Sequence, residues 1–216
     1  KALLAPEDLQ GATISLSNFG MFGAQFATPI IVTNLSEIID MTDTRETCLD
    51  IVGEPNHKSV HGIVQGGISS YNKRIPVLTN DRLSFLKKII MQQIKHIEIA
   101  LGLYPLEITN SWINVMPVGS EVKPHLHQYC VISGCLYLDA GEGAGSFYIE
   151  NPMLSNHMAY MLKEPHTEYT QPYLEVAVQT GTLILFPSYL RHFVHKNEYE
   201  SRTVLSFNTM YDDKFS

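Results

Sequence analysis

The feature that most constrains the fold of this chain is a change in the spacing of its apolar residues near Pro105. In two segments before Pro105 these residues recur every three or four positions, which is typical of an amphipathic helix. After Pro105 they alternate with polar residues, which is typical of strands. Helices therefore come first and many short strands follow. This order predicts an α+β fold, mainly β, with a β-sandwich or barrel in the C-terminal half.

Two helices are predicted in the first half. The first is expected between Ser36, which can act as its N-cap, and Gly53, which can end it. The second is predicted from about Asn80 to Leu101, with Gly102 as its stop. Its apolar residues step by three or four, as a helix packed on one face requires: Leu83, Leu86, Ile90, Ile94, Ile97 and Leu101.

The remaining segments are predicted to be extended or irregular. Residues 1–35 read as extended chain, and residues 54–79, which are rich in glycine and proline, read as a loop. Six strands are predicted after Pro105: Leu106–Met116, Cys130–Leu138, Ser146–Glu150, Leu174–Val178, Thr182–Pro187 and Thr203–Tyr211. Without a repeat or linker, one domain over residues 1–216 is expected, with supporting helices in 1–104 and the barrel core with its metal site in 105–216.

Charge and cysteine content exclude several classes of protein. The formal net charge of −7 argues against a general nucleic-acid-binding surface, which needs clustered Lys and Arg. Three cysteines without a CxxC pair, Cys48, Cys130 and Cys135, argue against a disulfide framework and favour a reducing compartment, so a cytoplasmic location is predicted. No membrane span or signal peptide is recognised, although residues upstream of Lys1 can be missing.

The nine histidines contain two informative clusters. On a strand, His125 and His127 would direct both imidazoles to one face, which is half of a metal site. His192 follows the predicted buried strand Leu183–Phe186, close to the end where sites on β scaffolds gather. His195 would face the other way. The other five, at 57, 61, 96, 157 and 166, are expected to be solvent-exposed or structural.

Arg202 lies ten residues after His192 and opens the last predicted strand. Its planar guanidinium can bind a carboxylate through two parallel hydrogen bonds, a use that suits a position beside a metal site. An HxH pair alone is weak evidence. Its combination with a hairpin, a Gly-strand-Pro-xxx-His segment and this arginine is much stronger.

With these pieces, the sequence resembles the iron(II)- and 2-oxoglutarate-dependent oxygenases, in particular uncharacterised prolyl-hydroxylase-like bacterial and phage-type members that carry HxH. The resemblance covers roughly the second half of the chain. The matching pieces are, in the order of the family, 112–114 (Trp-Ile-Asn), 125–127 (His-Leu-His), 133–137 (Ser-Gly-Cys-Leu-Tyr), 145–147 (Gly-Ser-Phe), 151–152 (Asn-Pro), 181–192 and 202–208.

The resemblance implies a double-stranded β-helix, a jelly-roll, cupin-like barrel with flanking helices. His125, His127 and His192 would hold iron(II), while Arg202 and Tyr137 would bind the far carboxylate of the co-substrate 2-oxoglutarate. Ascorbate is a further candidate cofactor. The implied reaction is hydroxylation of an unactivated C–H bond in a prolyl, other peptidyl or small-molecule substrate. Asn114 could contact the co-substrate or the substrate, or bond within its strand.

One residue departs from the family pattern. The usual ligand set is two histidines and one carboxylate, and His127 stands at the carboxylate position, which leaves the site one unit more positive. His125 and His192 could also bind the metal alone, with water completing the shell.

Two other functions stay open at this point. One is a cupin-like module that holds a metal or small ligand without turnover, and the other is metal-assisted isomerisation or hydrolysis. The loops at residues 54–79 and 153–173 are expected to select the substrate. No membrane or nucleic-acid partner is expected, and a homo-oligomer stays open.

Overall fold

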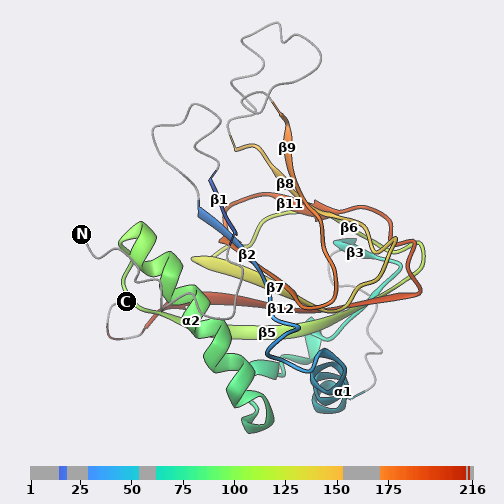
Figure 1. Ribbon diagram of the computed structural model, residues 1–216, viewed down its shortest axis with the longest axis horizontal. Coiled ribbons are helices and arrows are strands. Elements are labelled where there is room, and N and C mark those ends of the chain that lie inside the picture. The colour runs from blue at the N-terminus through green and yellow to red at the C-terminus, as the bar shows by residue number, and fades with distance from the viewer. Residues whose placement is uncertain (1–14, 19–28, 54–61, 153–170, 213, 215–216) are drawn as a thin grey trace, which may run out of the picture.

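The computed structural model describes residues 15–18, 29–53, 62–152, 171–212 and 214, and its strands form two antiparallel sheets (Figure 1). The larger sheet has the order β1 (Ser15–Asn18), β2 (Pro29–Asn34), β10 (Thr182–Pro187), β7 (Ile132–Asp139), β12 (Ser201–Tyr211), β5 (Leu106–Pro117) and β4 (Ile68–Ser69). The smaller has the order β3 (Val64–Gln65), β6 (Glu121–His125), β11 (His192–Val194), β8 (Phe147–Glu150) and β9 (Tyr173–Val176). The prediction of a mainly β chain with a few helices is confirmed.

Two α-helices, α1 (Met41–Val52) and α2 (Ser84–Leu101), lie along one face of the larger sheet (Figure 1). Three short 3-10 helices, η4 (Tyr71–Lys73), η5 (Val77–Thr79) and η6 (Asp81–Leu83), lie between them in the chain. Ile90 and Ile94 of α2 are fully buried in the same apolar cluster as Leu136 and Leu205 of the sheet. This packing stabilises the helices through their apolar faces.

A second apolar cluster lies between the two sheets. It joins Tyr137 and Ile184 of the larger sheet to Phe147 and Ile149 of the smaller one. Because side chains alternate along a strand, Leu136 faces the helices while its neighbour Tyr137 faces the other sheet. The alternation of side chains along the strands of the larger sheet therefore supplies two cores, one on each face of that sheet.

The predicted N-cap of the first helix is wrong. Asp40 caps α1, since its side chain accepts a hydrogen bond from the Asp43 N–H at 3.0 Å. The Ser36 hydroxyl instead donates to Asn34 Oδ1 at 2.6 Å and closes a turn after β2. The end of α2 is as predicted, because Gly102 adopts a left-handed conformation that terminates the helix.

The pair Gly66-Gly67 has a structural use within the predicted loop. It joins β3, which pairs with β6 in the smaller sheet, to β4, which pairs with β5 in the larger one. Gly66 has a φ of 73°, and a Cβ on Gly67 would lie 2.7 Å from Met116 Sδ. The link between the sheets therefore requires glycine at both positions.

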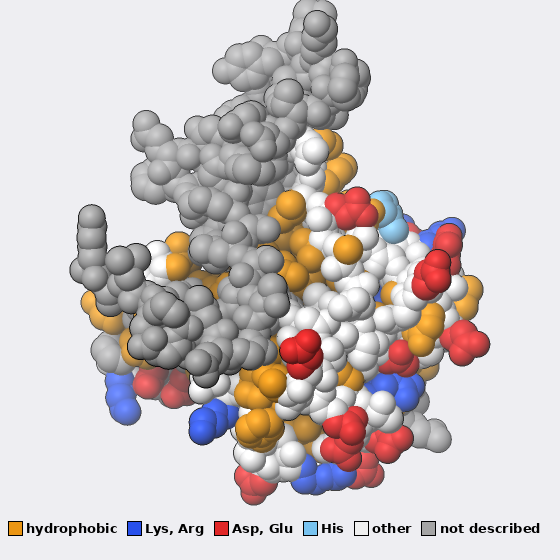
Figure 2. Space-filling model, in the orientation of Figure 1, with side chains coloured by type: hydrophobic (Ala, Val, Ile, Leu, Met, Phe, Trp, Pro, Cys, Tyr) orange, Lys and Arg blue, Asp and Glu red, His pale blue; other side chains and the backbone are white. Residues whose placement is uncertain are grey.

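The charges on the surface and the length of the helices are relevant to the predicted absence of nucleic-acid and membrane partners. On the face shown in Figure 2, basic side chains are interspersed with acidic ones and do not form one large patch. Within the described ranges, no helix is long and apolar enough to cross a bilayer. The cytoplasmic location and the absence of nucleic-acid partners stay predictions.

Candidate metal centre

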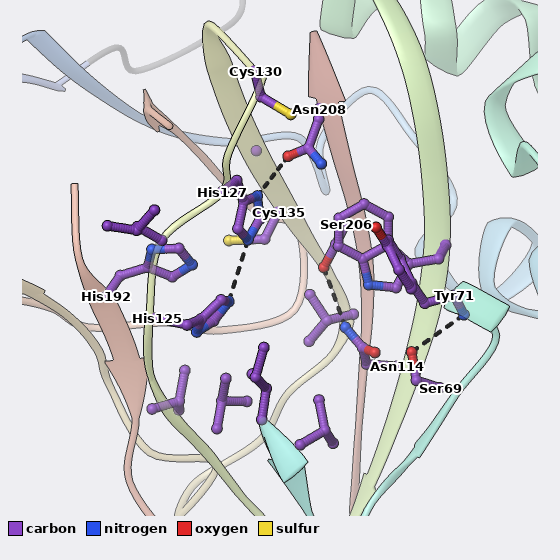
Figure 3. Close-up of a pocket in the computed structure, with 18 of the residues that line it drawn as sticks. Ser69, Tyr71, Asn114, His125, His127, Cys130, Cys135, His192, Ser206 and Asn208 are labelled. Atoms are coloured by element: carbon purple, nitrogen blue, oxygen red, sulfur yellow. Dashed lines mark hydrogen bonds between the residues drawn. The ribbon is translucent and has the colours of Figure 1, made fainter. Parts of the chain in front are cut away.

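Three histidines from two neighbouring strands converge (Figure 3). His125 ends β6 and His192 begins β11, and the two residues are direct partners in the antiparallel register. Their ring centroids lie 4.2 Å apart, and the His127 ring lies 5.1 Å from each. One nitrogen of each ring lies within 4.8 Å of the others, so the predicted triad is assembled in space.

The backbone orients two of these imidazoles. His125 Nδ1 lies 2.8 Å from the Lys123 carbonyl, and His192 Nδ1 lies 2.9 Å from the Leu190 carbonyl. A carbonyl oxygen can only accept a hydrogen bond, so both Nδ1 atoms carry the proton. Each Nε2 then has a free lone pair, as a metal ligand requires.

His127 completes the set from just beyond the end of β6. Its Nδ1 lies 2.5 Å from Asn208 Oδ1, and its Nε2 lies 3.2 Å from His125 Nε2. If His127 also carries its proton on Nδ1, the Nε2 lone pairs of His125 and His127 face each other, and a cation shared between them would relieve their repulsion. Three imidazole nitrogens are a donor set that suits iron and similar divalent metals.

Burial keeps the three imidazoles neutral. Burial lowers the pKa of His125 to about 4, with a smaller contribution from His127. Burial likewise lowers the pKa of His127, and that of His192, which is only 4% exposed, falls well below 6.5. The neutral imidazole is the form in which histidine binds a metal.

The histidines line a cavity of about 770 Å³ between the two sheets. Alternating residues of β5 and β12 form much of its wall: Asn110, Trp112, Asn114, Met116, Arg202, Val204, Ser206 and Asn208. Among the described residues, Arg202 is the only Lys, Arg, Asp or Glu that lines this cavity.

Arg202 is a buried cation with spare hydrogen-bonding capacity. It is 1% exposed, its Nη1 donates to the Ala144 carbonyl, and its buried Nη2 has no partner. Burial lowers its pKa, and no carboxylate is paired with it among the described residues. A buried guanidinium with a free N–H group fits an anionic ligand such as a carboxylate.

Tyr137 lies beside Arg202 in the cavity wall and is 1% exposed. Burial raises the pKa of its phenol, while the Arg202 charge acts in the opposite direction. The phenol is therefore neutral and can donate a hydrogen bond to the same anion.

Asn114 also lines the cavity, with its amide divided between two environments (Figure 3). Its Nδ2 donates to Ser206 Oγ at 3.3 Å, while its buried Oδ1 has no partner. The oxygen suits a hydrogen-bond donor better than a carboxylate. The role of Asn114 in binding the co-substrate stays a prediction.

The sequence reasoning missed three polar residues behind His127: Ser133, Ser188 and Asn208. Ser133 Oγ lies 2.8 Å from His127 Nδ1, from Asn208 Oδ1 and from Ser188 Oγ. Asn208 has the same strand parity as Arg202, and that shared parity was the available signal.

The histidines set aside from the sequence lie away from the cavity or outside the described residues. His96 lies on α2, and His195 contacts the Tyr148 ring with centroids 4.7 Å apart. His57, His61, His157 and His166 fall outside the described residues, as do residues 54–61 and 153–170 of the two predicted substrate-selecting loops.

A family model described as "Putative 2OG-Fe(II) oxygenase" matches residues 110–208, a range that contains every candidate site residue. The resemblance stated from the sequence is thereby confirmed over these residues, which make up a little less than half of the chain. A second model, for the catalytic domain of 2-oxoacid dehydrogenase acyltransferases, matches residues 1–64 and includes none of the candidate ligands. Comparison with curated protein sequences finds no match.

Solved structures share the fold at low sequence identity. A Trichoplax adhaerens prolyl hydroxylase, in complex with a peptide fragment of the hypoxia inducible factor oxygen degradation domain, has 15% identity and a TM-score of 0.59, over 86% of this chain and 84% of that one. HygX from Streptomyces hygroscopicus, with nickel, 2-oxoglutarate and hygromycin B bound, has 13% identity and a TM-score of 0.52, over 97% and 88%.

A third relative matches over a shorter range. It is an oxidoreductase of the 2OG-Fe(II) oxygenase family from Burkholderia pseudomallei, with 22% identity and a TM-score of 0.38. The match covers 48% of this chain and 44% of that one, so the chain spans less than half of that protein's length.

Proposed function

We propose that this oxygenase hydroxylates an unactivated C–H bond of an uncharged substrate, with His125, His127 and His192 as its iron ligands. One observation carries the proposal: three neutral imidazoles and a buried arginine with a free N–H group line the same cavity. The first group suits a divalent metal, and the second suits the far carboxylate of 2-oxoglutarate.

Each residue has a distinct task in this proposal. The three Nε2 atoms would hold the metal, and Arg202 and Tyr137 would bind and orient the co-substrate. Iron(II), with 2-oxoglutarate and dioxygen, supplies oxidation of the substrate C–H bond, with succinate and carbon dioxide as the other products. Apolar side chains such as Phe147 and Phe186 keep water away from this chemistry.

The proposed architecture is a double-stranded β-helix within a single domain. Two antiparallel sheets with a shared apolar interior support it, as does the short connection from β3 to β4 that links the sheets. The fold shared with the prolyl hydroxylase and HygX points the same way.

The substrate chemistry follows from the rest of the cavity wall. Trp112 and Tyr71 form an edge-to-face pair with ring centroids 4.9 Å apart. Asn110 and Asn114 each present a buried amide oxygen without a partner. These groups suit an uncharged molecule with an apolar face and N–H or O–H donors, which fits a prolyl or other peptidyl segment or a neutral small molecule.

The decisive experiment tests for turnover. Purified protein is given iron(II) and 2-oxoglutarate without oxygen, and a weak visible charge-transfer band and a rise in melting temperature are expected. Admission of air should then give succinate, even without added substrate, through slow uncoupled turnover. If neither the band nor the melting shift appears, the oxygenase proposal fails.

Two controls separate the other functions. A cupin-like binding module would bind metal but form no succinate. A metal-dependent isomerase or hydrolase would not need 2-oxoglutarate. The wild type and Arg202→Ala would then both show no response to 2-oxoglutarate.

A further inference from the structure

We propose that Asn208, supported by Ser133 and Ser188, is a positioning residue that holds His127 with its proton on Nδ1 and thereby presents Nε2 to the metal. This inference rests on the proposed function in one respect, namely that His127 is a metal ligand. The Nδ1 atoms of His125 and His192 bond to backbone carbonyls, whereas Nδ1 of His127 bonds to the side-chain amide of Asn208.

The register of the larger sheet builds this support. Asn208 of β12 pairs with Ser133 of β7, and both side chains face the cavity side of the sheet. Asn208 is 4% exposed, while Ser133 and Ser188 are fully buried. Buried polar groups of this kind are retained where their hydrogen bonds are made, and each has a partner within the group.

The main chain of His127 is fixed by the same group. Because His127 lies beyond the end of β6, no strand ladder holds it. Its N–H donates to the Ser188 carbonyl at 3.0 Å, and the Ser188 N–H donates to the Val131 carbonyl at 3.0 Å. Ser188 therefore anchors the backbone while Asn208 anchors the ring.

Two hydrogen-bond patterns compete for the His127 ring. In the first, Nδ1–H donates to Asn208 Oδ1 at 2.5 Å, the Ser133 hydroxyl donates to the same oxygen at 2.8 Å, and Nε2 is free. In the second, Ser133 donates to Nδ1 and Nε2–H donates to His125 Nε2 at 3.2 Å, which blocks the metal. The short Nδ1–Oδ1 distance favours the first, because two lone pairs would repel at that separation.

The amide also determines the charge of the ligand. An amide oxygen accepts the Nδ1 hydrogen bond without adding charge, so His127 stays a neutral imidazole. A carboxylate at position 208 would make the imidazole a stronger electron donor and return negative charge near the metal. With Asn208 as its partner, the ligand at position 127 stays neutral, whereas the usual carboxylate at that position carries a negative charge.

The first test reads the proton position directly in the metal-free protein. Long-range ¹H–¹⁵N spectra of ¹⁵N-histidine-labelled protein distinguish a proton on Nδ1 from one on Nε2. We expect the Nδ1–H form at His127 in the wild type and in Asn208→Asp, and the Nε2–H form or a mixture in Asn208→Leu. A wild-type His127 in the Nε2–H form overturns the proposal.

The second test measures Mn(II) affinity and the visible spectrum with Co(II). Loss of a hydrogen-bond partner of a ligating histidine weakens metal binding about 10- to 100-fold, so Asn208→Leu should fall in this range. Asn208→Asp should bind Mn(II) at least as tightly as the wild type. If Asn208→Leu binds like the wild type, or Asn208→Asp is as weak as Asn208→Leu, the proposal is wrong.

Thr209→Val is the matched control. Thr209 is the next residue on β12, and its hydroxyl bonds to the Ile132 backbone on the side away from the cavity. The control should melt at a lower temperature with unchanged Mn(II) affinity and Co(II) spectrum. Ser188→Ala is the substitute variant if Asn208→Leu does not fold. It should weaken Mn(II) binding in the same direction but to a smaller extent. Wild-type protein that binds no metal would refute the proposed function, whereas the NMR result would still decide the proton position.

Discussion

Replacement of Arg202 by Met should weaken 2-oxoglutarate binding strongly without unfolding the protein. Arg202 is 1% exposed and its buried Nη2 has no protein partner, which suits a group that binds an absent anion. Loss of one member of a buried, hydrogen-bonded charge pair costs about 2–5 kcal/mol. That free energy corresponds to a dissociation constant raised about 30- to 4,000-fold.

The stability of the protein without co-substrate should behave differently. Arg202→Met removes the hydrogen bond from Nη1 to the Ala144 carbonyl, but it also removes a desolvated charge and an unsatisfied N–H group. These effects, of about 1–3 kcal/mol each, have opposite signs. The free energy of unfolding should therefore stay within about 1 kcal/mol of the wild type, far from the loss of about 3–5 kcal/mol for a broken buried ion pair.

The assay combines calorimetric titration of 2-oxoglutarate into the Mn(II) protein with urea unfolding in the absence of 2-oxoglutarate. Arg45→Met is the control, because Arg45 bonds to Thr203, adjacent to Arg202, but does not line the cavity. It should bind 2-oxoglutarate normally. The reasoning is refuted if Arg202→Met binds 2-oxoglutarate within about threefold of the wild type, or if it loses 3 kcal/mol or more of stability.

Three further outcomes are expected. The metal-free protein should lose stability as the pH falls from about 6.5 towards 4, because buried His125 has its pKa lowered to about 4 and takes up a proton on unfolding. The loss approaches about 1.4 kcal/mol per pH unit for each such histidine. A free energy of unfolding in urea that does not change over this pH range would contradict the prediction. Gly134→Ala should destabilise the protein by about 1–3 kcal/mol in urea, since the added Cβ lies 2.7 Å from Leu185 Cδ2 and against the Phe207 ring. Mn(II) and 2-oxoglutarate should each raise the affinity of the other about 5- to 150-fold by calorimetry, and independent binding would rule this out.

The sequence predicted the long, strongly patterned elements well. The strand Thr182–Pro187 was predicted with its observed bounds, and the last strand began only two residues before its predicted start at Thr203. Helix α2 ended at Gly102, as expected from the conformational freedom of glycine. Helix α2 is buried against one core, while β10 and β12 contribute side chains to both. This burial requires the apolar residues that made the three elements recognisable in the sequence.

The two strands that carry His125 and His192 were not predicted. β6 reads Glu-Val-Lys-Pro-His, with mixed exposure and a proline, and β11 has three residues. Neither carries enough alternation to be recognised, because each is held by its partner strand and not by its own pattern. The sequence nevertheless grouped His125 with His192, because the spacing of the whole segment carried the resemblance, and the two residues are direct partners in the antiparallel register.

In the proposed function, the charges around the cavity account for a histidine at position 127. Three neutral imidazoles offer a divalent metal no negative charge, and Arg202 adds a positive one to the same cavity. In the proposed function the two negative charges of 2-oxoglutarate balance the arginine and part of the metal charge, so each of the two ligands favours the binding of the other. Asn208 is the point at which the protein can adjust this balance, because it sets the electron donation of His127 without contacting the metal. A metal centre of this kind would obtain its balancing negative charge from the co-substrate. In the usual site, part of that negative charge comes from the carboxylate side chain.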